Sequence, residues 1–230
     1  MARLSTATIS SLAALAVCSG VALAEAPRFN VATDAPHDEG VIAAMQGLAM
    51  AQQLASRGVE TGDPILLIAA ARLASQVDVS ESTVRTRDEM VDAAGDSPAL
   101  HTAAEMLTAA RALSGGRDDL LGLIEDAEAE SARGSIYGSG YYEGYISGGD
   151  NLYYDEAFFG GEQAVITLQG HNPSDIDLWI YDEFGNLICS STGYSSYETC
   201  SFTPRWTGNF TIRVENEGHP QGTYFTLWTN

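Results

Sequence analysis

Apolar residues recur every three or four positions over residues 38–133, the spacing that places them on one face of an α-helix. Asp63-Pro64 and Ser97-Pro98 each supply a capping side chain followed by proline at the first helical position. The pattern predicts an α-helical domain of helix hairpins over residues 38–133, in which residues 80–95 fit either a short helix or a charged loop. The four apolar faces contain Val41, Met45, Leu48 and Ala55; Leu66, Ala69, Ala70, Leu73 and Val77; Ala99, Ala103, Met106, Ala110 and Leu113; and Leu120, Ile124 and Ala127.

From residue 162 onward, apolar and polar residues alternate, as they do in strands that bury one face. Turn-forming residues separate the alternating runs 164–168, 175–181, 210–214 and 223–228. If Ile176, Leu178 and Ile180 face inward, Asp177 and Trp179 lie on the opposite face. Short antiparallel strands at this spacing are typical of a sandwich. We therefore predict a jelly-roll-like antiparallel β-sandwich over residues 153–230, and an α+β fold in two parts for the whole chain.

Glycine and tyrosine are concentrated between these two parts. Residues 134–161 contain eight of the 23 glycines and six of the ten tyrosines, and we predict a linker over residues 134–152. Tyrosine and glycine together can form a surface that stacks on sugar rings or packs on a peptide. The alternative is that the rings lie against the neighbouring domain. The candidate surface consists of Tyr137, Tyr141, Tyr142, Tyr145, Tyr153 and Tyr154.

The first residues have the features of a secretion signal. A single positive charge at Arg3 precedes an uncharged run rich in Ala, Leu and Ser, and Ala22-Leu23-Ala24 has the small-x-small pattern of a cleavage site. We expect cleavage after Ala24, a flexible lead-in over residues 25–37, and a mature protein in the periplasm or outside the cell. Leu15-Ala16-Val17-Cys18 loosely matches a lipoprotein box, with Val17 departing from it, so lipidation of Cys18 is the competing expectation.

The charge of the chain narrows its range of partners. The formal net charge is −20, from 31 acidic and 11 basic residues. Such a surface repels nucleic acid and anionic lipid. No segment after the signal is apolar enough to span a bilayer. We therefore expect no nucleic-acid partner and no integral membrane insertion after the signal is cleaved.

Two cysteines remain once the signal is removed, and an even number in an exported chain indicates a disulfide. Cys189 and Cys200 each end a β-prone run, and the segment between them contains the turn signal Thr192-Gly193. We predict a bond between them that closes a hairpin of neighbouring strands.

The sequence contains no recognisable catalytic motif. A nucleophile elbow, a zinc helix and a phosphate loop are all missing from it. We expect His37, His101, His171 and His219 on the surface, and no enzymatic activity. We expect no cofactor, and Asp175, Asp177 and Asp182 are the candidate ligands if calcium binds. The competing interpretation is that these carboxylates cap turn amides.

Four stretches in the last third of the chain occur in the order seen in a known family. They are Gly161-Glu162-Gln163-Ala164-Val165, Asp175-Ile176-Asp177-Leu178-Trp179-Ile180-Tyr181-Asp182 with Gly185-Asn186, residues 207–216, and Gly222-Thr223-Tyr224. Over residues 150–230 the chain resembles the bacterial pre-peptidase C-terminal domain. The resemblance implies a β-sandwich accessory module that binds, anchors or aids secretion and is not itself catalytic.

These observations predict an exported, non-catalytic binding or accessory protein of the bacterial cell envelope that recognises a protein or a glycan. Two alternatives stay open. One is a secreted hydrolase with an unrecognised site in the helical domain, and the other is a structural component of the envelope.

Overall fold

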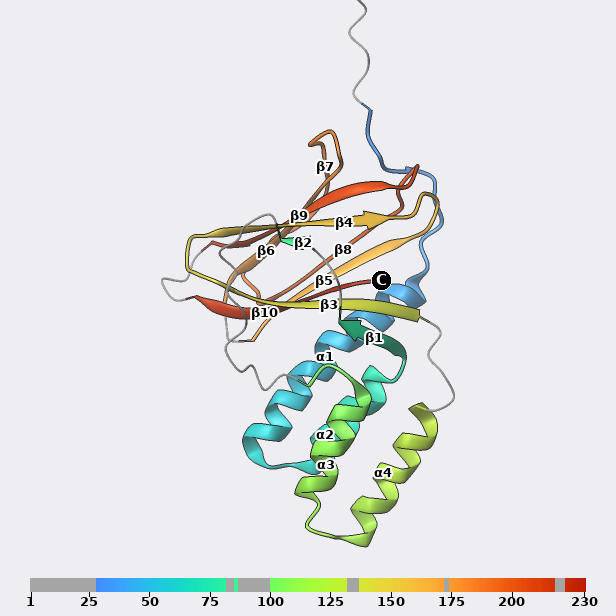
Figure 1. The fold of residues 1–230 in the computed structure, drawn as a ribbon, viewed down its shortest axis with the longest axis vertical. Helices are drawn as coiled ribbons and strands as arrows, with labels where there is room; N and C mark the ends of the chain where they lie inside the picture. The colour runs from blue at the N-terminus through green and yellow to red at the C-terminus, as the bar shows by residue number, and fades with distance from the viewer. Residues whose placement is uncertain (1–27, 82–84, 87–99, 132–136, 172–173, 218–221) are drawn as a thin grey trace, which may run out of the picture.

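The computed structural model describes residues 28–81, 85–86, 100–131, 137–171, 174–217 and 222–230. The predicted signal peptide, Cys18, the Ser97-Pro98 pair and His219 lie outside these residues. Four helices and ten strands occupy the described part of the chain (Figure 1). This arrangement confirms the α+β fold class.

The helices begin at caps of the kind expected from the sequence. Helix α1 (Glu39–Thr61) starts after Asp38, whose side chain accepts from the Gly40 amide, and α2 (Pro64–Ala74) starts after Asp63. A capping box between Thr102 and Glu105 starts α3 (Ala103–Leu113), and α4 is Asp118–Ser131. The described residues contain no helix with the length and apolarity needed to cross a membrane.

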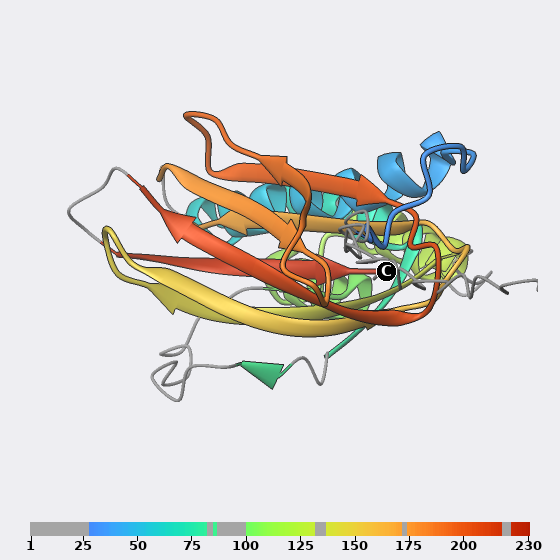
Figure 2. The same cartoon turned by 90° about the horizontal axis from the view of Figure 1, so that it is seen from above.

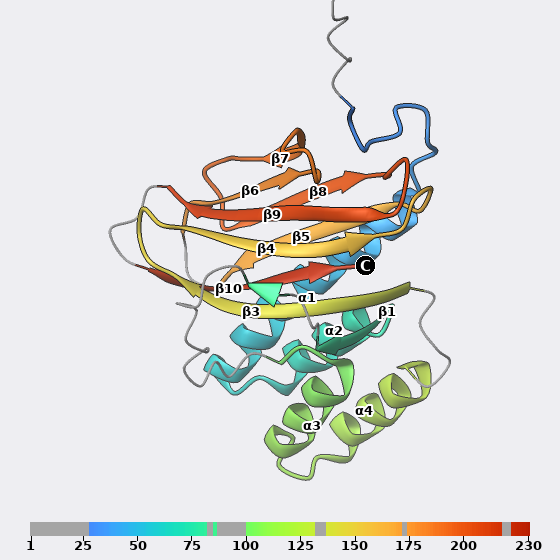
Figure 3. The same ribbon diagram turned by 45° about the horizontal axis from the view of Figure 1, so that its top comes forward.

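The strands form two five-stranded sheets that face each other (Figure 3). Sheet A has the order β1-β3-β10-β5-β8, and sheet B has the order β2-β4-β9-β6-β7. All pairings are antiparallel except the parallel pair of β1 and β3. The strands are β1 (Val77–Glu81), β2 (Arg85–Thr86), β3 (Tyr137–Ile146), β4 (Asn151–Phe158), β5 (Ala164–Gly170), β6 (Ile176–Tyr181), β7 (Leu187–Ser191), β8 (Tyr197–Phe202), β9 (Gly208–Asn216) and β10 (Thr223–Thr229).

Most of the segment predicted as a linker is a strand. Residues 137–146 form β3, which pairs with β10 on one side and β1 on the other. Tyrosine favours strands, and the glycines make room for packing: a Cβ on Gly144 would lie 2.7 Å from the ring of Phe225. Strands β1 and β2 likewise lie within the segment predicted to be helical. The helical region therefore contributes one edge strand to each sheet.

Two hydrophobic cores share sheet A. One core lies between the sheets and contains Phe210, Phe225 and Leu178. The other joins the helices to the outer face of sheet A, where Val165 and Trp228 are buried among helical residues. Helix contacts with the sandwich are concentrated on β5, β1 and β8 of sheet A. Figure 2 shows the sandwich from above, with the helices beyond it.

The lead-in segment is tied to the sandwich from residue 28 onward. Asn30 is fully buried, and its side chain accepts hydrogen bonds from the amides of Arg205 and Trp206. The Ala32 amide donates to the Thr203 carbonyl at 2.8 Å. The sequence predicted a flexible segment here because it has little periodicity, but Asn30 satisfies turn amides that would otherwise lack partners.

Candidate functional site

The outer face of sheet B carries polar and aromatic side chains on three adjacent strands. Strand β6 confirms the predicted alternation: Ile176, Leu178 and Ile180 are fully buried, and Trp179 points the other way. Trp179 is in register with Arg213 of β9, which in turn is in register with Tyr153 of β4. One row further along, Tyr181, Thr211 and Asp155 lie side by side. The described residues place no helix over this face (Figure 3).

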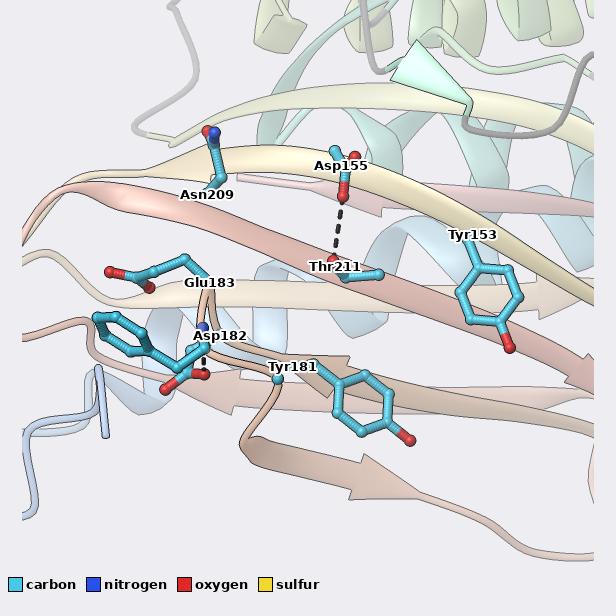
Figure 4. A pocket seen from close by; sticks show the side chains of 9 residues that line it. Tyr153, Asp155, Tyr181, Asp182, Glu183, Asn209 and Thr211 are labelled. Carbon is cyan, nitrogen blue, oxygen red and sulfur yellow. Dashed lines mark hydrogen bonds between the residues drawn. The ribbon is translucent and has the colours of Figure 1, made fainter. Parts of the chain in front are cut away.

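This face has a larger and a smaller hollow. The larger hollow has a volume of about 600 Å³. Tyr153 and Tyr181 lie on one side of it, and Glu183 and Asn209 lie on the other (Figure 4). Between them the Thr211 hydroxyl donates to Asp155 at 3.1 Å. The hollow thus combines three aromatic rings, two of them tyrosines, with several oxygen acceptors, and none of the described residues that line it is basic.

One wall of the larger hollow is the turn between β6 and β7. Asp182 holds this turn by accepting from the amides of Phe184 and Asn186 at 3.0 and 2.8 Å and from the Asn30 amide at 3.1 Å. Burial would raise the pKa of Asp182, but hydrogen bonds from Asn186, Asn30 and Phe184 hold this pKa below its usual range. The carboxylate of Asp182 therefore has a structural role in the turn.

Phe184 of the same turn also lines the larger hollow, and it packs against Trp206 from the segment between β8 and β9. Phe184 and Trp206 meet edge to face at a centroid distance of 6.4 Å, and the Trp206 indole donates to Glu183 at 2.6 Å. The Asn30 side chain donates to Glu183 at 3.2 Å and to the Trp206 carbonyl at 3.1 Å. The lead-in segment therefore supports the rim of the larger hollow.

A smaller hollow of about 240 Å³ lies at the opposite end of β6. Its lining includes Asp175, Asp177, Glu217, Trp179 and Tyr194. Asp177 is only 3% exposed. Burial, together with the carboxylates of Asp175, Glu217 and Glu198, raises its pKa to about 6, against a hydrogen bond from the Gly193 amide.

The three predicted calcium ligands are not brought together. Asp175 and Asp177 line the smaller hollow, whereas Asp182 lines the larger one and caps the turn beyond β6. Asp177 and Asp182 are five positions apart on a strand and its turn, roughly 16 Å at 3.3 Å per residue. Within the described residues, no group of three or more His, Cys, Asp or Glu side chains could hold a metal ion.

The predicted tyrosine surface is divided among three places. Tyr141 points toward the helices and stacks on the His101 ring, with the two ring centroids 4.2 Å apart. Tyr142 and Tyr154 pack together between the sheets, with their ring centroids 4.8 Å apart. Tyr145 is exposed beside Tyr224. Only Tyr153 lines a hollow on the outer face of sheet B. The side chain of Tyr137 lies outside the described residues.

Two histidines predicted to lie on the surface take part in the helix–sheet interface. His101 is 6% exposed, and its Nε2 lies 3.1 Å from Glu143 of β3. His171 lies 2.8 Å from the Thr226 hydroxyl, and burial, with the nearby His101, lowers its pKa against the effect of Glu143. His37 is exposed as expected. His101 lies in the predicted helical segment and His171 between two predicted strands, and neither local pattern reveals that the other part of the fold covers the side chain.

The predicted disulfide joins Cys189 and Cys200, with Cα atoms 6.0 Å apart. The two cysteines are not on paired strands of one hairpin. Strand β7 belongs to sheet B and β8 to sheet A, so the bond ties the edges of the two sheets together. The same residues therefore form the predicted bond in a different topological setting.

No family model and no curated protein matches the chain. Solved structures do show similarity. The pre-peptidase C-terminal domain of a collagenase from Bacillus anthracis is 13% identical, with 40% of this chain and 89% of that chain covered and a TM-score of 0.35. A periplasmic inhibitor of g-type lysozyme from Aeromonas hydrophila is 14% identical, with 40% of this chain and 84% of that chain covered and a TM-score of 0.31.

A carbohydrate-binding module in complex with calcium and xylotriose is 12% identical, with 38% of this chain and 77% of that chain covered and a TM-score of 0.26. Each of these likenesses concerns about two fifths of the present chain. The β-sandwich is established by its own strand order, and the ligands of those proteins are not carried over to this one.

Proposed function

We propose that this protein is a non-catalytic recognition module, exported to the periplasm or beyond, that binds a glycan on the outer face of sheet B. The observation that carries the proposal is the larger hollow, where Tyr153 and Tyr181 stand beside the polar groups of Asp155, Asn209 and Thr211. Sugar rings present both apolar C–H faces and hydroxyl edges. Aromatic rings next to hydrogen-bonding groups on a rigid sheet offer partners for both.

The charge of the hollow restricts the kind of glycan. Its described lining contains Asp155, Asp182 and Glu183 and no basic residue, and the whole chain has a net charge of −20. A uronic-acid or sulfated chain would be repelled at such a surface. The proposal is therefore a neutral or cationic glycan.

The carboxylates that line the larger hollow accept hydrogen bonds from the protein itself, which supports a non-catalytic role. A glycosidase needs two carboxyl groups free to act on the scissile bond, one as acid and one as base or nucleophile. Here Asp182 holds a turn, Asp155 accepts from Thr211, and Glu183 accepts from Trp206. Moving any of these groups to substrate would break the contacts that shape the hollow.

Export is proposed on the secretion signal of residues 1–24, with cleavage after Ala24. The bond between Cys189 and Cys200 supports it, because disulfides form and persist in oxidising compartments. Intact-mass measurement of the protein recovered from the periplasm or medium tests this, with Glu25 as the expected first residue. A lipid-modified chain beginning at Cys18 would overturn it.

Binding is tested by calorimetric titration with soluble neutral, amino-sugar and uronic-acid oligosaccharides. We expect binding of neutral or amino-sugar chains and none of uronic-acid chains. The double variant Tyr153→Ala/Tyr181→Ala should bind at least about tenfold more weakly, which corresponds to about 1.4 kcal/mol. Tyr145→Ala is the matched control, because it removes an exposed tyrosine from sheet A. Loss of affinity in the control alone, or binding of no oligosaccharide, would refute the proposal, and the second result would favour a protein partner.

A further inference from the structure

The smaller hollow has the features of a site for a positively charged group. Three carboxylates, those of Asp175, Asp177 and Glu217, line it together with the aromatic rings of Trp179 and Tyr194. Tyr194 is fully exposed, at 102% of its reference area, although aromatic rings are usually at least partly buried. None of the described residues that line this hollow is basic.

Asp177 is the central group of the smaller hollow. Asp177 is 3% exposed, and the Gly193 amide donates a hydrogen bond to its carboxylate. A carboxylate can accept about four hydrogen bonds, so a ligand with N–H groups in the hollow would offer it further donors. The charged groups that act on its pKa are Asp175, Glu217 and Glu198, all of them acidic, and its register partner on β9 is Glu215, which is paired with Arg213.

Burial of a carboxylate without a compensating charge is costly, and neighbouring carboxylates increase the cost. The pKa of Asp177 is raised because of that cost. A cation placed in the hollow would offset both effects. The basic side chain of Arg213 borders the hollow, because it lies over the ring of Trp179 at 4.6 Å, and its charge is paired with Glu215 at 2.6 Å.

The chemistry of the lining favours an organic ammonium over a metal ion. No set of three acidic or metal-binding side chains in the described residues has the geometry for a metal. Aromatic rings beside carboxylates suit an ammonium group, which gains from hydrogen bonds to oxygen and from contact with a ring face. A volume of about 240 Å³ is below the usual range for a drug-sized ligand, and it suits one residue of a longer chain.

We propose that the smaller hollow binds the free ammonium group of an amino sugar, so that the glycan recognised by the outer face of sheet B is one that contains unacetylated amino sugars. This inference rests on the proposed function. The two hollows lie toward opposite ends of β6, and the lining residues Trp179 of one and Tyr181 of the other are two positions apart, about 7 Å along the strand. An oligosaccharide lying along β6 reaches both, with its rings against Tyr181 and Tyr153 and one amine at Asp177.

The experiment compares glucosamine oligomers with N-acetylglucosamine oligomers of the same length by calorimetry. Acetylation removes the positive charge and keeps the sugar ring. Wild-type protein should bind the free-amine chain at least about tenfold more tightly near neutral pH. In Asp177→Asn this preference should disappear, because a neutral amide replaces the carboxylate. Asp126→Asn, which removes the same charge from the exposed face of α4, should keep it.

The pH dependence provides a second readout. At pH 5 only about one tenth of an acid with a pKa near 6 is ionised. Lowering the pH from 7 to 5 should therefore weaken binding of the free-amine chain to the wild type by about tenfold relative to the change in Asp177→Asn, which reports the titration of the amine alone. The acetylated chain should show no such change. Circular dichroism of Asp177→Asn confirms that the variant is folded before its preference is measured.

The outcomes separate the two proposals. If both chains bind the wild type equally, and Tyr153→Ala/Tyr181→Ala weakens both, the glycan-binding function stands and the ammonium site is refuted. If neither chain nor any other oligosaccharide binds, the proposed function fails and this inference fails with it. If a lysine-containing peptide binds more tightly than the glucosamine chain and competes with it, the amino-sugar assignment is overturned.

Discussion

The outer faces of the two sheets have similar strand patterns and opposite environments. On sheet A, the outward residues of β10 include Thr226 and Trp228, which are at most 1% exposed because α1 and its neighbours pack over them. On sheet B, the outward residues of β6 include Trp179 and Tyr181, which border two hollows. Each strand places a tryptophan on its outer face, but one tryptophan belongs to a core and the other to a candidate binding surface. Tertiary contacts with the helices decide the difference.

The largest expected effect comes from truncating the tryptophan on the covered face. Trp228→Ala should destabilise the protein by about 3–5 kcal/mol, the usual cost of removing a buried tryptophan. The matched variant Trp179→Ala should cost only about 1 kcal/mol, because that ring is partly exposed. Urea unfolding followed by circular dichroism measures both.

The same unfolding curves test whether the two cores are coupled. Since Val165 and Trp228 of the sandwich are part of the helical core, helix and strand signals should be lost in one transition. Two well-separated transitions, or equal costs for the two tryptophans, would contradict the contrast between the faces.

The disulfide connects the covered sheet to the open one, and its removal should cost about 3 kcal/mol in the chain-entropy model. The expected result of Cys189→Ala/Cys200→Ala is a lower midpoint of urea unfolding with folded helices. Alkylation of the unfolded, unreduced wild type should find both thiols protected. Two free thiols would show that the bond does not form.

Asp177 on the open face should make stability depend on pH. Its pKa is about 6 in the folded protein and near 3.9 in the unfolded chain, so folding favours the neutral form. The resulting penalty is absent below the unfolded pKa and grows as pH rises through 6, to at most about 3 kcal/mol. Asp177→Asn should therefore be more stable than wild type at pH 8 and equally stable at pH 3. Thermal unfolding at both pH values checks this, and lower stability of the variant at pH 8 would contradict it.

Sequence patterns predicted the helices and strands better than they predicted which other segments pack against them. Capping residues and apolar spacing located α1 and α2, and alternation located β6 and its inward side chains, because these signals arise within one segment. The cysteines were paired correctly for a different reason: they are the two that remain outside the predicted signal peptide, and an exported chain is expected to form a disulfide. Their placement on different sheets depends on how β7 and β8 diverge, which no local pattern encodes.

The candidate site was harder to predict because it depends on packing between distant segments. Tyr141 and Tyr142 are adjacent in sequence, but strand geometry sends one toward the helices and the other between the sheets. The period of two could have divided the tyrosines once residues 137–146 were recognised as a strand. That Tyr181 shares a hollow with Tyr153 follows from the order of β4, β9 and β6, which the sequence does not specify.

The central claim, that the open face of sheet B is the binding surface, is tested most directly by an NMR titration of the isotope-labelled protein with glucosamine oligomers and N-acetylglucosamine oligomers. The account predicts that the largest amide shifts fall on β4, β6 and β9, at residues such as Tyr153, Tyr181 and Thr211, whereas amides of α1 and β10 are unaffected. Shifts concentrated on α1 and β10, or saturable binding with no change on sheet B, would contradict it.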